Sequence, residues 1–423
     1  MVLIATLGSL GDLHPFIAIG SALKDRGAKV LMAVPASHVS KVEASGLEAR
    51  AIMPDHDAVR SELGMTEAEF ARRVMTSPDF LIKQIILRSL ADSTRALDQI
   101  AAEADIVFGS IYALSAQIVC QKRSIPYVAG LLQPLAFQSA VDPPRTPDFR
   151  MMARYPARGL ALSWNRIWQS VIFAEVKRRY SGPVNAVRKE HGLGPLKNAP
   201  VFALETEPKL RLALYSRKLG PDDPVRVAGA QFTGFPLFDS NSGRQERLDQ
   251  DLEVFLNGGE PPVVFTLGSF AVYASGAFYE HSAEACRRMG LRAIFLTGRS
   301  QNAQTTGPTL TRSYLPHSLV FSRCAAIVHH GGIGTTGQAM MAGRPQVVVP
   351  HMGDQWDNGY RLERLGVATV VPARDYTAKS ARRVITEILD NQALSERAEH
   401  VARDVRLESG AATAAERILS ALH

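Results

Sequence analysis

The sequence predicts an α/β protein with two parallel-sheet domains in series. Three observations carry this prediction. The chain opens with an apolar strand, a glycine-serine turn and an amphipathic helix, which is the start of a βαβ unit. The same succession begins again after Gly258. The length of 423 residues suffices for two or three domains, each with its own hydrophobic core.

In the first array, residues 2–6 form an apolar strand that ends in a turn at residues 8–12. A helix is expected over residues 15–26, with Pro15 in its first turn and Gly27 at its end. Further strands are expected at residues 29–34, 105–110 and 127–132, with a helix at residues 113–122.

The second array repeats this order and ends in an alanine-rich helical tail over residues 380–423. Strands are expected at residues 262–267, 293–297, 319–321, 326–329, 346–349 and 368–371. A stretch rich in Gly, Pro, Asn and Ser separates the arrays and is typical of a linker. We therefore expect an amino-terminal domain over residues 1–235, a linker over 236–245, a second domain over 246–405 and a terminal helix over 406–423.

Composition narrows the class of protein. Apolar residues make up 46% of the chain and charged residues 21%, which excludes a mainly disordered, collagen-like or coiled-coil protein. No window reaches the roughly 18 apolar residues of a transmembrane helix. The amino terminus leads directly into a strand, so no signal peptide is expected. Three widely spaced cysteines fit no zinc motif and suit a reducing cytoplasm.

The formal net charge of +7 favours an anionic partner. Nucleic acid, a phosphorylated metabolite and a lipid surface all meet that description. The positive charge is spread along the chain and no nucleic-acid-binding motif accompanies it, so nucleic acid is not expected. Residues 160–180 form an amphipathic segment edged by Arg and Lys, which fits either a core-facing helix or an interfacial helix that touches lipid.

A glycine loop follows a predicted strand of the second array. Residues 332–337 read Gly-Ile-Gly-Thr-Thr-Gly, and Asp354 lies 22 residues beyond Gly332, which resembles a dinucleotide fingerprint and an NAD-dependent oxidoreductase. The loop lies outside the first βα turn, however, and two histidines precede it. Under either interpretation glycines and a helix amino terminus favour a bound diphosphate.

The longer stretch over residues 329–358 resembles the nucleotide-sugar signature of a glycosyltransferase family that includes sterol glucosyltransferases and UDP-glucuronosyltransferases. Residues 8–12, 233–239 and 295–298 resemble further stretches of its rhamnolipid rhamnosyltransferase group, so the resemblance covers nearly the whole chain. It implies the GT-B architecture, in which two Rossmann-like parallel-sheet domains face each other across a cleft.

The resemblance also implies residue roles on the donor side. His330 matches a histidine on the donor diphosphate, and Asp354 and Gln355 match the pair that holds sugar hydroxyls. The positions matching contacts to the phosphates or the nucleobase are Gly11, Gly268, Ser269, Tyr314, His317, Gly332, Gly334, Thr335 and Thr336. The transition state develops negative charge on the leaving diphosphate, and N–H donors, hydroxyls and an imidazole stabilise such charge.

The catalytic base is expected just after the first strand. Plant-type relatives carry Gly-His-x-x-Pro there, and the same frame reads Gly-Asp-Leu-His-Pro at residues 11–15, which puts Asp12 at the base position. Ser110 stands where those relatives carry a relay aspartate, which fits a carboxylate acting alone. Asp12 also fits a helix N-cap, and His14 is the second candidate base.

The expected activity is inverting sugar transfer from a nucleoside diphosphate sugar, with UDP favoured and dTDP as the alternative. No metal site and no resident cofactor are expected, because no carboxylate cluster accompanies the motifs. The acceptor is expected to be a lipid-like hydroxyl, such as a ceramide or a hydroxy fatty acid, bound by the apolar segments 53–90 and 133–180. A small aromatic or polyketide aglycone is the alternative. The expected location is the cytoplasm or the inner face of the cell membrane, on anionic lipid.

Overall fold

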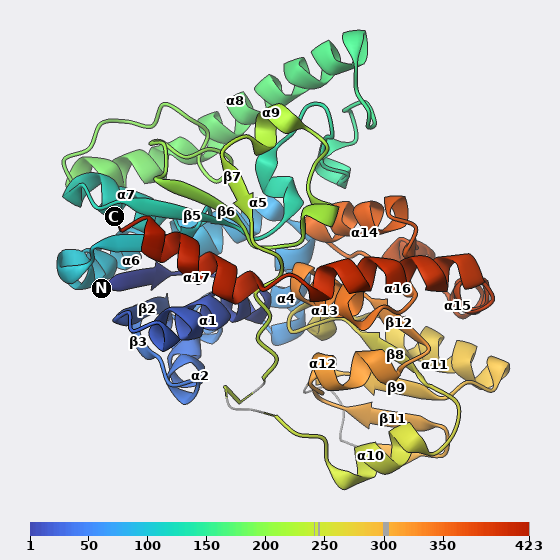
Figure 1. Cartoon of the computed structure of the whole chain (residues 1–423). Coiled ribbons are helices and arrows are strands. Elements are labelled where there is room, and N and C mark those ends of the chain that lie inside the picture. Colours follow the sequence, from blue (N-terminus) through green and yellow to red (C-terminus); the bar gives the residue numbers. More distant parts are fainter. Residues whose placement is uncertain (241, 244–245, 299–303, 423) are drawn as a thin grey trace. The chain divides into compact units, whose positions relative to one another are not determined.

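The computed structural model describes residues 1–240, 242–243, 246–298 and 304–422 (Figure 1). The chain forms two compact units. The first comprises Met1–Thr66, Ser77–Phe238 and Ser409–His423. The second comprises Glu67–Thr76 and Asp239–Glu408. Each unit contains one sheet covered by helices, as the βα pattern predicts.

The sheet of the first unit has seven strands, and every pairing is parallel. Their spatial order is β3-β2-β1-β4-β5-β6-β7. The strands are β1 (Val2–Ala5), β2 (Val30–Pro35), β3 (Glu48–Met53), β4 (Ile106–Ser110), β5 (Tyr127–Leu131), β6 (Leu210–Ala213) and β7 (Ala230–Phe232). Strands β1, β2, β4 and β5 are buried over their whole length, which explains their nearly continuous apolar sequences.

Helices connect these strands and cover the sheet. The α-helices of the first unit are α1 (Leu10–Asp25), α2 (Val39–Ala44), α3 (His56–Glu62), α5 (Pro78–Phe80), α6 (Leu90–Ile100), α7 (Leu114–Arg123), α8 (Gly159–Glu190), α9 (Pro224–Val227) and α17 (Gly410–Ser420). A π-helix, η2, spans Leu81–Leu87, and short 3-10 turns are η1 (Ala36–His38), η3 (Ala101–Glu103), η4 (Pro134–Phe137), η5 (Pro147–Phe149) and η6 (Arg217–Leu219). The core joins Ile4 and Phe108 of the sheet to Phe16 and Ile19 of α1.

The sheet of the second unit also has seven strands, in the order β10-β11-β9-β8-β12-β13-β14. They are β8 (Val263–Thr266), β9 (Ala293–Leu296), β10 (Gln304–Thr306), β11 (Thr309–Arg312), β12 (Ala326–His329), β13 (Gln346–Val348) and β14 (Ala368–Val370). All pairings are parallel except the hairpin of β10 and β11. Two apolar clusters, one containing Val263 and Phe265 and the other Val264 and Ile294, include alternate residues of the strands.

The helices of the second unit follow the strand order. They are α4 (Glu67–Thr76), α10 (Gln250–Asn257), α11 (Phe278–Met289), α12 (His317–Val320), α13 (Ile333–Ala342), α14 (Asp354–Arg364), α15 (Ala378–Leu389) and α16 (Gln392–Arg406), with 3-10 turns η7 (Ala271–Ala274), η9 (Phe321–Arg323) and η10 (Ala373–Asp375).

Two helices belong to the unit that their position in the sequence does not suggest. Helix α4 lies within the first half of the chain, yet it packs on η7 of the second unit, and Met75 adds to an apolar cluster there. Helix α17 ends the chain and packs on α1, where Ala414 and Ile418 join the core of the first unit. The close fit of α17 continues at Gly410, where a Cβ would lie 2.3 Å from the carbonyl carbon of Phe235.

The strand orders place a topological switch point in each sheet. In the first, β1 lies between β2 and β4, and in the second, β8 lies between β9 and β12. Ligands of open α/β sheets bind beyond the carboxyl ends of strands at such a switch point. The turns after β1, β8 and β12 carry Asp12, Gly268 and His330, so the fold places the predicted site residues where ligand binding is expected.

Three sequence-based expectations differ from the structure or fall outside it. Helix α1 begins at Leu10, because Ser9 caps it, so Pro15 lies inside the helix and Asp12 lies in its first turn instead of at the N-cap. The segment 319–321 is helical (α12 and η9) instead of a strand, and it buries Val320 and Phe321 in the core. Residues 241 and 244–245 of the expected linker lie outside the described residues.

Candidate active site

The candidate site of the first unit is the turn from β1 into α1. The Asp12 carboxylate accepts hydrogen bonds through Oδ2 from the Ser9 backbone N–H at 2.9 Å and from Ser9 Oγ at 3.3 Å. Gly8 has a φ of 109°, and a Cβ there would lie 2.4 Å from Asp12 Oδ2. The glycine at position 8 therefore lets the backbone wrap closely around the carboxylate.

The surroundings of Asp12 make it a weak acid. Desolvation by burial raises the pKa of Asp12 to about 6, against the opposing hydrogen bonds from the Ser9 backbone and side chain. A carboxylate with a pKa near 6 is ionised at neutral pH and still accepts a proton readily, as a general base must.

The neighbours of Asp12 hold the turn in shape. His38 Nε2 lies 2.9 Å from the carbonyl oxygen of Gly8, and the His14 ring packs edge-on against Phe238 at 5.3 Å. Gly11 is exposed on the first turn of α1. Ser110, at the end of the neighbouring strand β4, is buried and its Oγ accepts from the Tyr112 backbone N–H at 3.2 Å. His38 was not predicted as part of this turn.

The candidate site of the second unit centres on His330, which directly follows β12. A Cβ on Gly268 would lie 2.6 Å from His330 Cε1, and a Cβ on Gly332 would lie 2.4 Å from His330 Nε2. The imidazole therefore lies against two glycine turns, one after β8 and one after β12, that leave no room for side chains. The structure brings Gly268 next to His330 and Gly332, from which it is distant in the sequence.

The His330 imidazole is neutral, and one of its ring nitrogens is available to bind a ligand. Burial, then the nearby His329, His351 and His317, hold the pKa of His330 well below its ordinary value. Its Nδ1 atom is buried and has no hydrogen-bond partner among the described residues. A buried unpartnered polar atom in a native structure calls for an explanation, and a ligand is one.

Helix α13 begins three residues after His330, at Ile333. Its N-cap is Gly332, which offers no side chain to the first backbone N–H groups of the helix. These groups and the helix dipole favour a bound anion. Gly334 leaves open space where a Cβ would stand, whereas Thr335 and Thr336 are buried. The Thr336 hydroxyl lacks a hydrogen-bond partner among the described residues.

A second histidine, which the sequence analysis did not assign, shapes this turn. His329 Nδ1 accepts from the Gly331 backbone N–H at 3.2 Å, and Nε2 lies 3.0 Å from Gln346 Oε1. This pattern requires the proton on Nε2, so the ring is neutral. Burial accordingly lowers the pKa of His329 to about 4, despite the opposing hydrogen bond to Gln346. His329 is a positioning residue for the glycine turn.

The start of α14 closes onto the same turn. Asn358 Nδ2 donates to the Gly331 carbonyl at 3.0 Å and to Asp354 Oδ2 at 2.9 Å. Gln355 Oε1 accepts from the backbone N–H groups of His351 at 2.9 Å and Met352 at 3.1 Å. The acceptor atom of Gln355 is thus used by its own loop. Asn358 was missed, although its i, i+4 spacing from Asp354 puts both on one helix face.

Tyr314 and His317 form a separate group. Tyr314 Oη donates to Asp239 Oδ1 at 2.7 Å, and Asp239 Oδ2 accepts from the Ser318 backbone N–H at 2.6 Å. The rings of Tyr314 and His317 are stacked at 5.9 Å. The hydroxyl of Tyr314 is therefore tied to Asp239 instead of to the His330 turn. Ser269, the last predicted donor residue, is exposed directly after Gly268.

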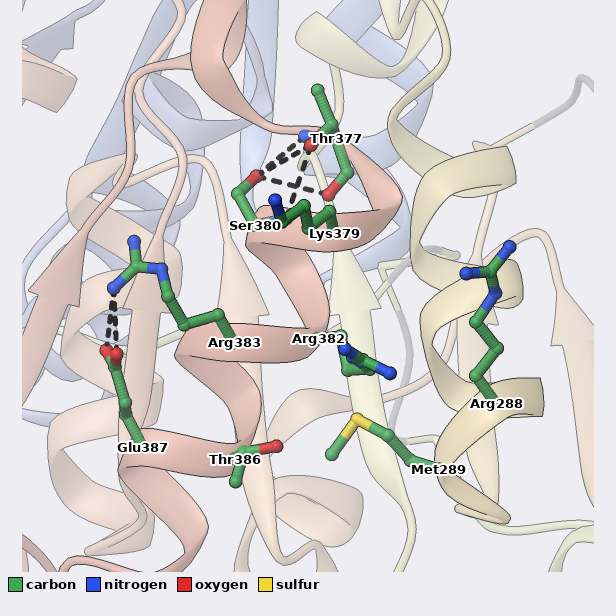
Figure 2. A pocket seen from close by; sticks show the side chains of 9 residues that line it. All are labelled: Arg288, Met289, Thr377, Lys379, Ser380, Arg382, Arg383, Thr386 and Glu387. Carbon is green, nitrogen blue, oxygen red and sulfur yellow. Dashed lines mark hydrogen bonds and ion pairs between the residues drawn. The ribbon is translucent and has the colours of Figure 1, made fainter.

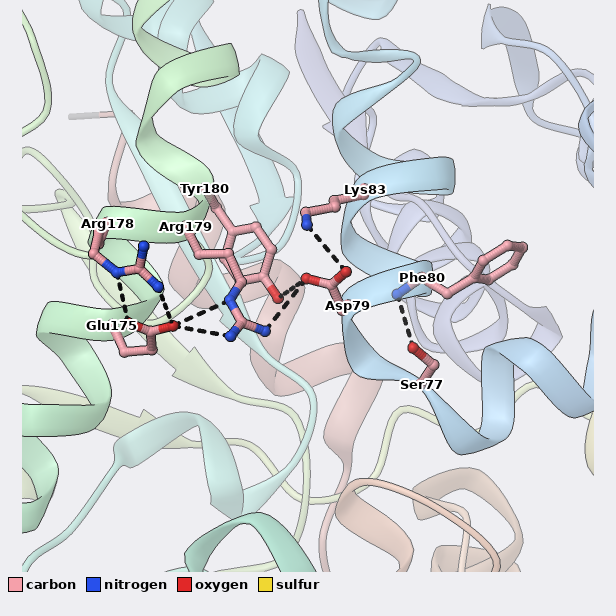
Figure 3. Close-up of polar contacts among 8 residues, drawn as sticks. All are labelled: Ser77, Asp79, Phe80, Lys83, Glu175, Arg178, Arg179 and Tyr180. Atoms are coloured by element: carbon pink, nitrogen blue, oxygen red, sulfur yellow. Dashed lines mark hydrogen bonds and ion pairs between the residues drawn. The ribbon is translucent and has the colours of Figure 1, made fainter.

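Of the two segments expected to bind the acceptor, residues 53–90 are fixed to α8 by polar contacts of Asp79 (Figure 3). Asp79 accepts from Tyr180 Oη at 3.0 Å and pairs with Lys83 Nζ at 3.1 Å and Arg179 Nη1 at 3.5 Å. Burial opposes ionisation, but the hydrogen bonds from Lys83 and Tyr180 and the nearby cations hold the pKa of Asp79 below its ordinary value. Ser77 caps α5 through the Phe80 backbone N–H at 3.2 Å. These contacts anchor the start of the π-helix η2.

A groove of about 700 Å³ lies elsewhere in the second unit, along α11 and α15 (Figure 2). Most of its cationic side chains are exposed, and two are neutralised by carboxylates on their own helices, since Arg288 pairs with Glu284 and Arg383 with Glu387. None of the predicted donor residues lines it. We assign it no role in the reaction.

The described part of the chain holds neither a metal-binding cluster nor a membrane-spanning helix. No group of three or more His, Cys, Asp or Glu side chains there is arranged to hold a metal ion. No helix there combines the length and the apolar character needed to cross a bilayer.

Comparison with known families matches both units. Residues 2–130 match the glycosyltransferase family 28 N-terminal domain, and residues 294–419 match the C-terminal domain of erythromycin biosynthesis protein CIII-like proteins. The chain is a nucleotide-sugar glycosyltransferase with the GT-B fold. The two-domain α/β architecture predicted from the sequence is confirmed.

Relatives of this glycosyltransferase span its whole length. It is 29% identical to O-mycaminosyltylonolide 6-deoxyallosyltransferase of Streptomyces fradiae, over 97% of this chain and 94% of that protein. It is 28% identical to vancomycin aglycone glucosyltransferase of Amycolatopsis orientalis, over 100% of this chain and 97% of that protein. A sterol 3-beta-glucosyltransferase of Yarrowia lipolytica is 25% identical over 98% of this chain, which corresponds to 28% of that protein.

Solved structures agree on the fold. The glycosyltransferase VinC in complex with dTDP superposes with a TM-score of 0.71 at 16% identity, covering 100% of this chain and 99% of that one. The glycosyltransferase of kitacinnamycin gives a TM-score of 0.71 at 20% identity, covering 100% and 99%.

The packing around His330 gives a first testable prediction. The Gly332→Ala variant keeps an allowed backbone conformation, but the new Cβ displaces the imidazole. Misplacing a catalytic group by about 1 Å can cost on the order of 10²-fold in rate, so we expect kcat/KM to fall by that order. The control is Gly182→Ala, where nothing lies within 4 Å of the added Cβ. Unchanged kinetics for Gly332→Ala in a folded protein would show that the position of His330 is unimportant.

Proposed function

We propose that this glycosyltransferase moves a sugar from a nucleoside diphosphate to a hydroxyl of a hydrophobic acceptor, with inversion at the anomeric carbon. The observation that supports it most is the environment of His330. A neutral buried imidazole with an unpartnered Nδ1 stands beside two glycine turns at the amino terminus of α13. Such a set of uncharged N–H donors suits a diphosphate whose negative charge grows as the sugar leaves.

The bond changes in this proposal balance without another reactant. The acceptor oxygen forms a bond to the anomeric carbon while its proton passes to the Asp12 carboxylate. The bond between the anomeric carbon and the diphosphate oxygen breaks, and its electron pair stays on the leaving diphosphate. Attack from the side opposite the leaving group inverts the anomeric centre. No metal ion or resident cofactor enters this scheme.

Asp12 is the proposed base and His14 the second candidate. The raised pKa of Asp12 supports the role, because the carboxylate is both ionised and basic near neutral pH. His14 lies two residues further along α1 and packs against Phe238. Asp354 and Gln355 are proposed to bind sugar hydroxyls, and Tyr314 with His317 the nucleobase. Gly11, Gly268, Ser269, Gly332, Gly334, Thr335 and Thr336 are proposed to form the turns around the phosphates.

For the acceptor we propose an aglycone with a large ring framework. The relatives are named for O-mycaminosyltylonolide, the vancomycin aglycone and a sterol, each of which carries hydroxyl groups on such a framework. A lipid with a free hydroxyl is the second candidate. A particular closeness to the rhamnolipid enzymes stays a prediction of the sequence motifs.

The donor base is proposed to be uracil or thymine. The sequence motifs favour UDP, and the solved structure of VinC contains dTDP. The proposed place of action is the cytoplasm, where both classes of nucleotide sugar are made available.

The test is product formation by the full chain with UDP- and dTDP-hexoses and a panel of a macrolide aglycone, a sterol, a ceramide and a 3-hydroxy fatty acid. We expect one acceptor class to yield a glycoside whose anomeric configuration, read from the NMR coupling constant, is opposite to that of the donor. Retention of configuration would contradict the single-displacement mechanism. Transfer to the lipids alone would reverse our order of acceptor classes.

A further inference from the structure

The first half of α8 exposes a row of large apolar side chains. Leu160, Trp164, Ile167 and Val171 are 90%, 45%, 59% and 51% exposed. Their spacings of four, three and four residues put them on one face of the helix. Figure 1 shows α8 as one long continuous helix. We call these four residues the α8 ridge.

The opposite face of the same segment is polar and buried. Asn165 is fully buried, accepts from the Ala153 backbone N–H at 2.6 Å and donates to the Ala140 carbonyl at 2.9 Å. Gln169 is buried and donates to the Gln138 carbonyl. This segment therefore inverts the usual amphipathic arrangement, since it buries amides and exposes aliphatic and aromatic side chains. The buried hydrogen bonds fix the rotation of the helix, so the α8 ridge cannot turn inward without breaking them.

The ridge is also held at its start. Trp164 Nε1 donates to the Met151 carbonyl at 2.8 Å, and the rings of Trp164 and Trp168 meet edge to face at 5.8 Å. Met151 is itself exposed. The preceding loop thus extends the apolar surface and stiffens it.

The ridge and the loop before it carry unpaired positive charge. The stretch 149–174 contains four arginines and neither Asp nor Glu. The arginines are Arg150, Arg154, Arg158 and Arg166, all exposed. Across the described residues, none of the four takes part in an ion pair. A salt-bridged surface would show acidic partners here, as Glu175 does for Arg178 and Arg179 further along the helix.

We propose that the α8 ridge docks on an anionic lipid bilayer, with its apolar side chains in the interfacial region and the four arginines on lipid phosphates. An apolar helix face with tryptophan and flanking Arg is the pattern of an interfacial helix. A second copy of the chain fits less well, because a symmetric pairing through the ridge would bring both sets of arginines together. This proposal concerns where the enzyme binds, so it is independent of the identity of the acceptor.

The experiment is co-sedimentation of the full chain with phosphatidylcholine vesicles, with and without about one third phosphatidylglycerol. We expect binding only to the anionic vesicles. Replacing Ile167 and Val171 by Asp is expected to weaken that binding by about tenfold or more, because it removes apolar area and adds negative charge. Val254→Asp, at a 66% exposed position on α10, is the matched control and should bind as the parent does.

A second variant tests the charge separately. Arg158→Gln with Arg166→Gln is expected to weaken binding by about fivefold for each arginine, since one juxtamembrane cation contributes about 1 kcal/mol. The binding of UDP or dTDP is measured for every variant. Retained nucleotide binding shows that the variant is folded, and it tests the sugar-transfer proposal separately from the membrane-docking proposal.

Three results would overturn the proposal. One is equal binding to neutral and anionic vesicles. Another is unchanged vesicle binding by the Ile167→Asp, Val171→Asp variant. The third is a parent protein that does not bind vesicles but dimerises, with the dimer lost in that variant. This result would show that the ridge is an interface between copies of the chain.

Discussion

The Asp12→Asn variant is expected to lose on the order of 10²–10⁴-fold in kcat, the usual contribution of a general base. Asparagine keeps the size and can still accept the hydrogen bonds from Ser9, but it cannot take up the acceptor proton. The affinity for UDP and dTDP should stay within about twofold of the parent, because the loss concerns only the transition state. Steady-state kinetics and nucleotide titration measure the two quantities.

The same carboxylate predicts a pH dependence. Burial raises the pKa of Asp12 to about 6, and the base must be ionised to work. The rate should therefore be constant above pH 7 and fall tenfold per pH unit well below pH 6. Ser9→Ala removes a hydrogen bond that stabilises the carboxylate, so its midpoint should move to higher pH.

Stability provides the control for Asp12. The pKa of Asp12 is higher in the folded protein than in the unfolded chain, so ionisation opposes folding once the pH rises above the unfolded value near 4. The neutral Asp12→Asn variant should then unfold at the same temperature as the parent, or higher, at pH 8. An inactive but less stable variant would indicate a structural role, and full activity would identify a different base, with His14→Ala as the next variant to measure.

The second large effect is expected at His330. His330→Ala should lower kcat by about 10²–10³-fold, as the loss of one preorganised donor to a developing anion does. It should also weaken donor binding, because Nδ1 has no partner among the described residues and a diphosphate oxygen would supply one. His330→Gln keeps an N–H donor and should recover part of the loss.

The protonation state of His330 sharpens this prediction. Burial and the three neighbouring imidazoles keep the ring neutral in the absence of ligand. A positively charged ring would instead make donor binding strongest at low pH. An affinity for UDP that does not change with salt or between pH 7 and 9 fits a neutral His330 that donates a hydrogen bond. Wild-type kinetics for His330→Ala would show that His330 has no part in the mechanism.

Much of the architecture could be predicted because its signals are local. Apolar runs marked β1, β2, β4, β5, β8, β9, β12, β13 and β14, and six of these strands, β2-β1-β4 and β9-β8-β12, form the two switch points. The strands β3, β6, β7, β10 and β11 were not predicted. Exposed or partly exposed residues interrupt most of them, as in Glu48–Met53 and Gln304–Thr306, so their sequences lack a continuous apolar run.

The sequence motifs proposed a set of candidate site residues, but they could not predict the geometry of those residues. Motifs identified Gly268, His330 and Gly332, whereas only the fold shows that both glycines leave space for one imidazole. The supporting residues His38 and Asn358 act through backbone carbonyls of glycines, and nothing in the spacing of a side chain reveals a carbonyl partner. Local sequence specifies which turn forms, and tertiary packing decides what the turn contacts.

Sequence patterns could not predict which unit some segments belong to, because this depends on contacts between residues far apart in the chain. Helix α4 belongs with η7, directly after the Gly268 turn, although its sequence lies inside the segment expected to bind the acceptor. Phe238 packs on His14 in the first unit, and the next residue, Asp239, holds Tyr314 in the second. A composition rich in Gly, Pro and Ser predicted a linker there but gave no sign of these two anchors.

The most direct test of the account is calorimetric titration of UDP and dTDP into the parent protein and into His330→Ala. We expect at least one of the two nucleotides to bind the parent with one site per chain. We expect the alanine variant to bind that nucleotide at least about tenfold more weakly, a loss of about 1.4 kcal/mol. Equal affinity in the two proteins, or no binding of either nucleotide to the parent, would contradict a donor site built around His330.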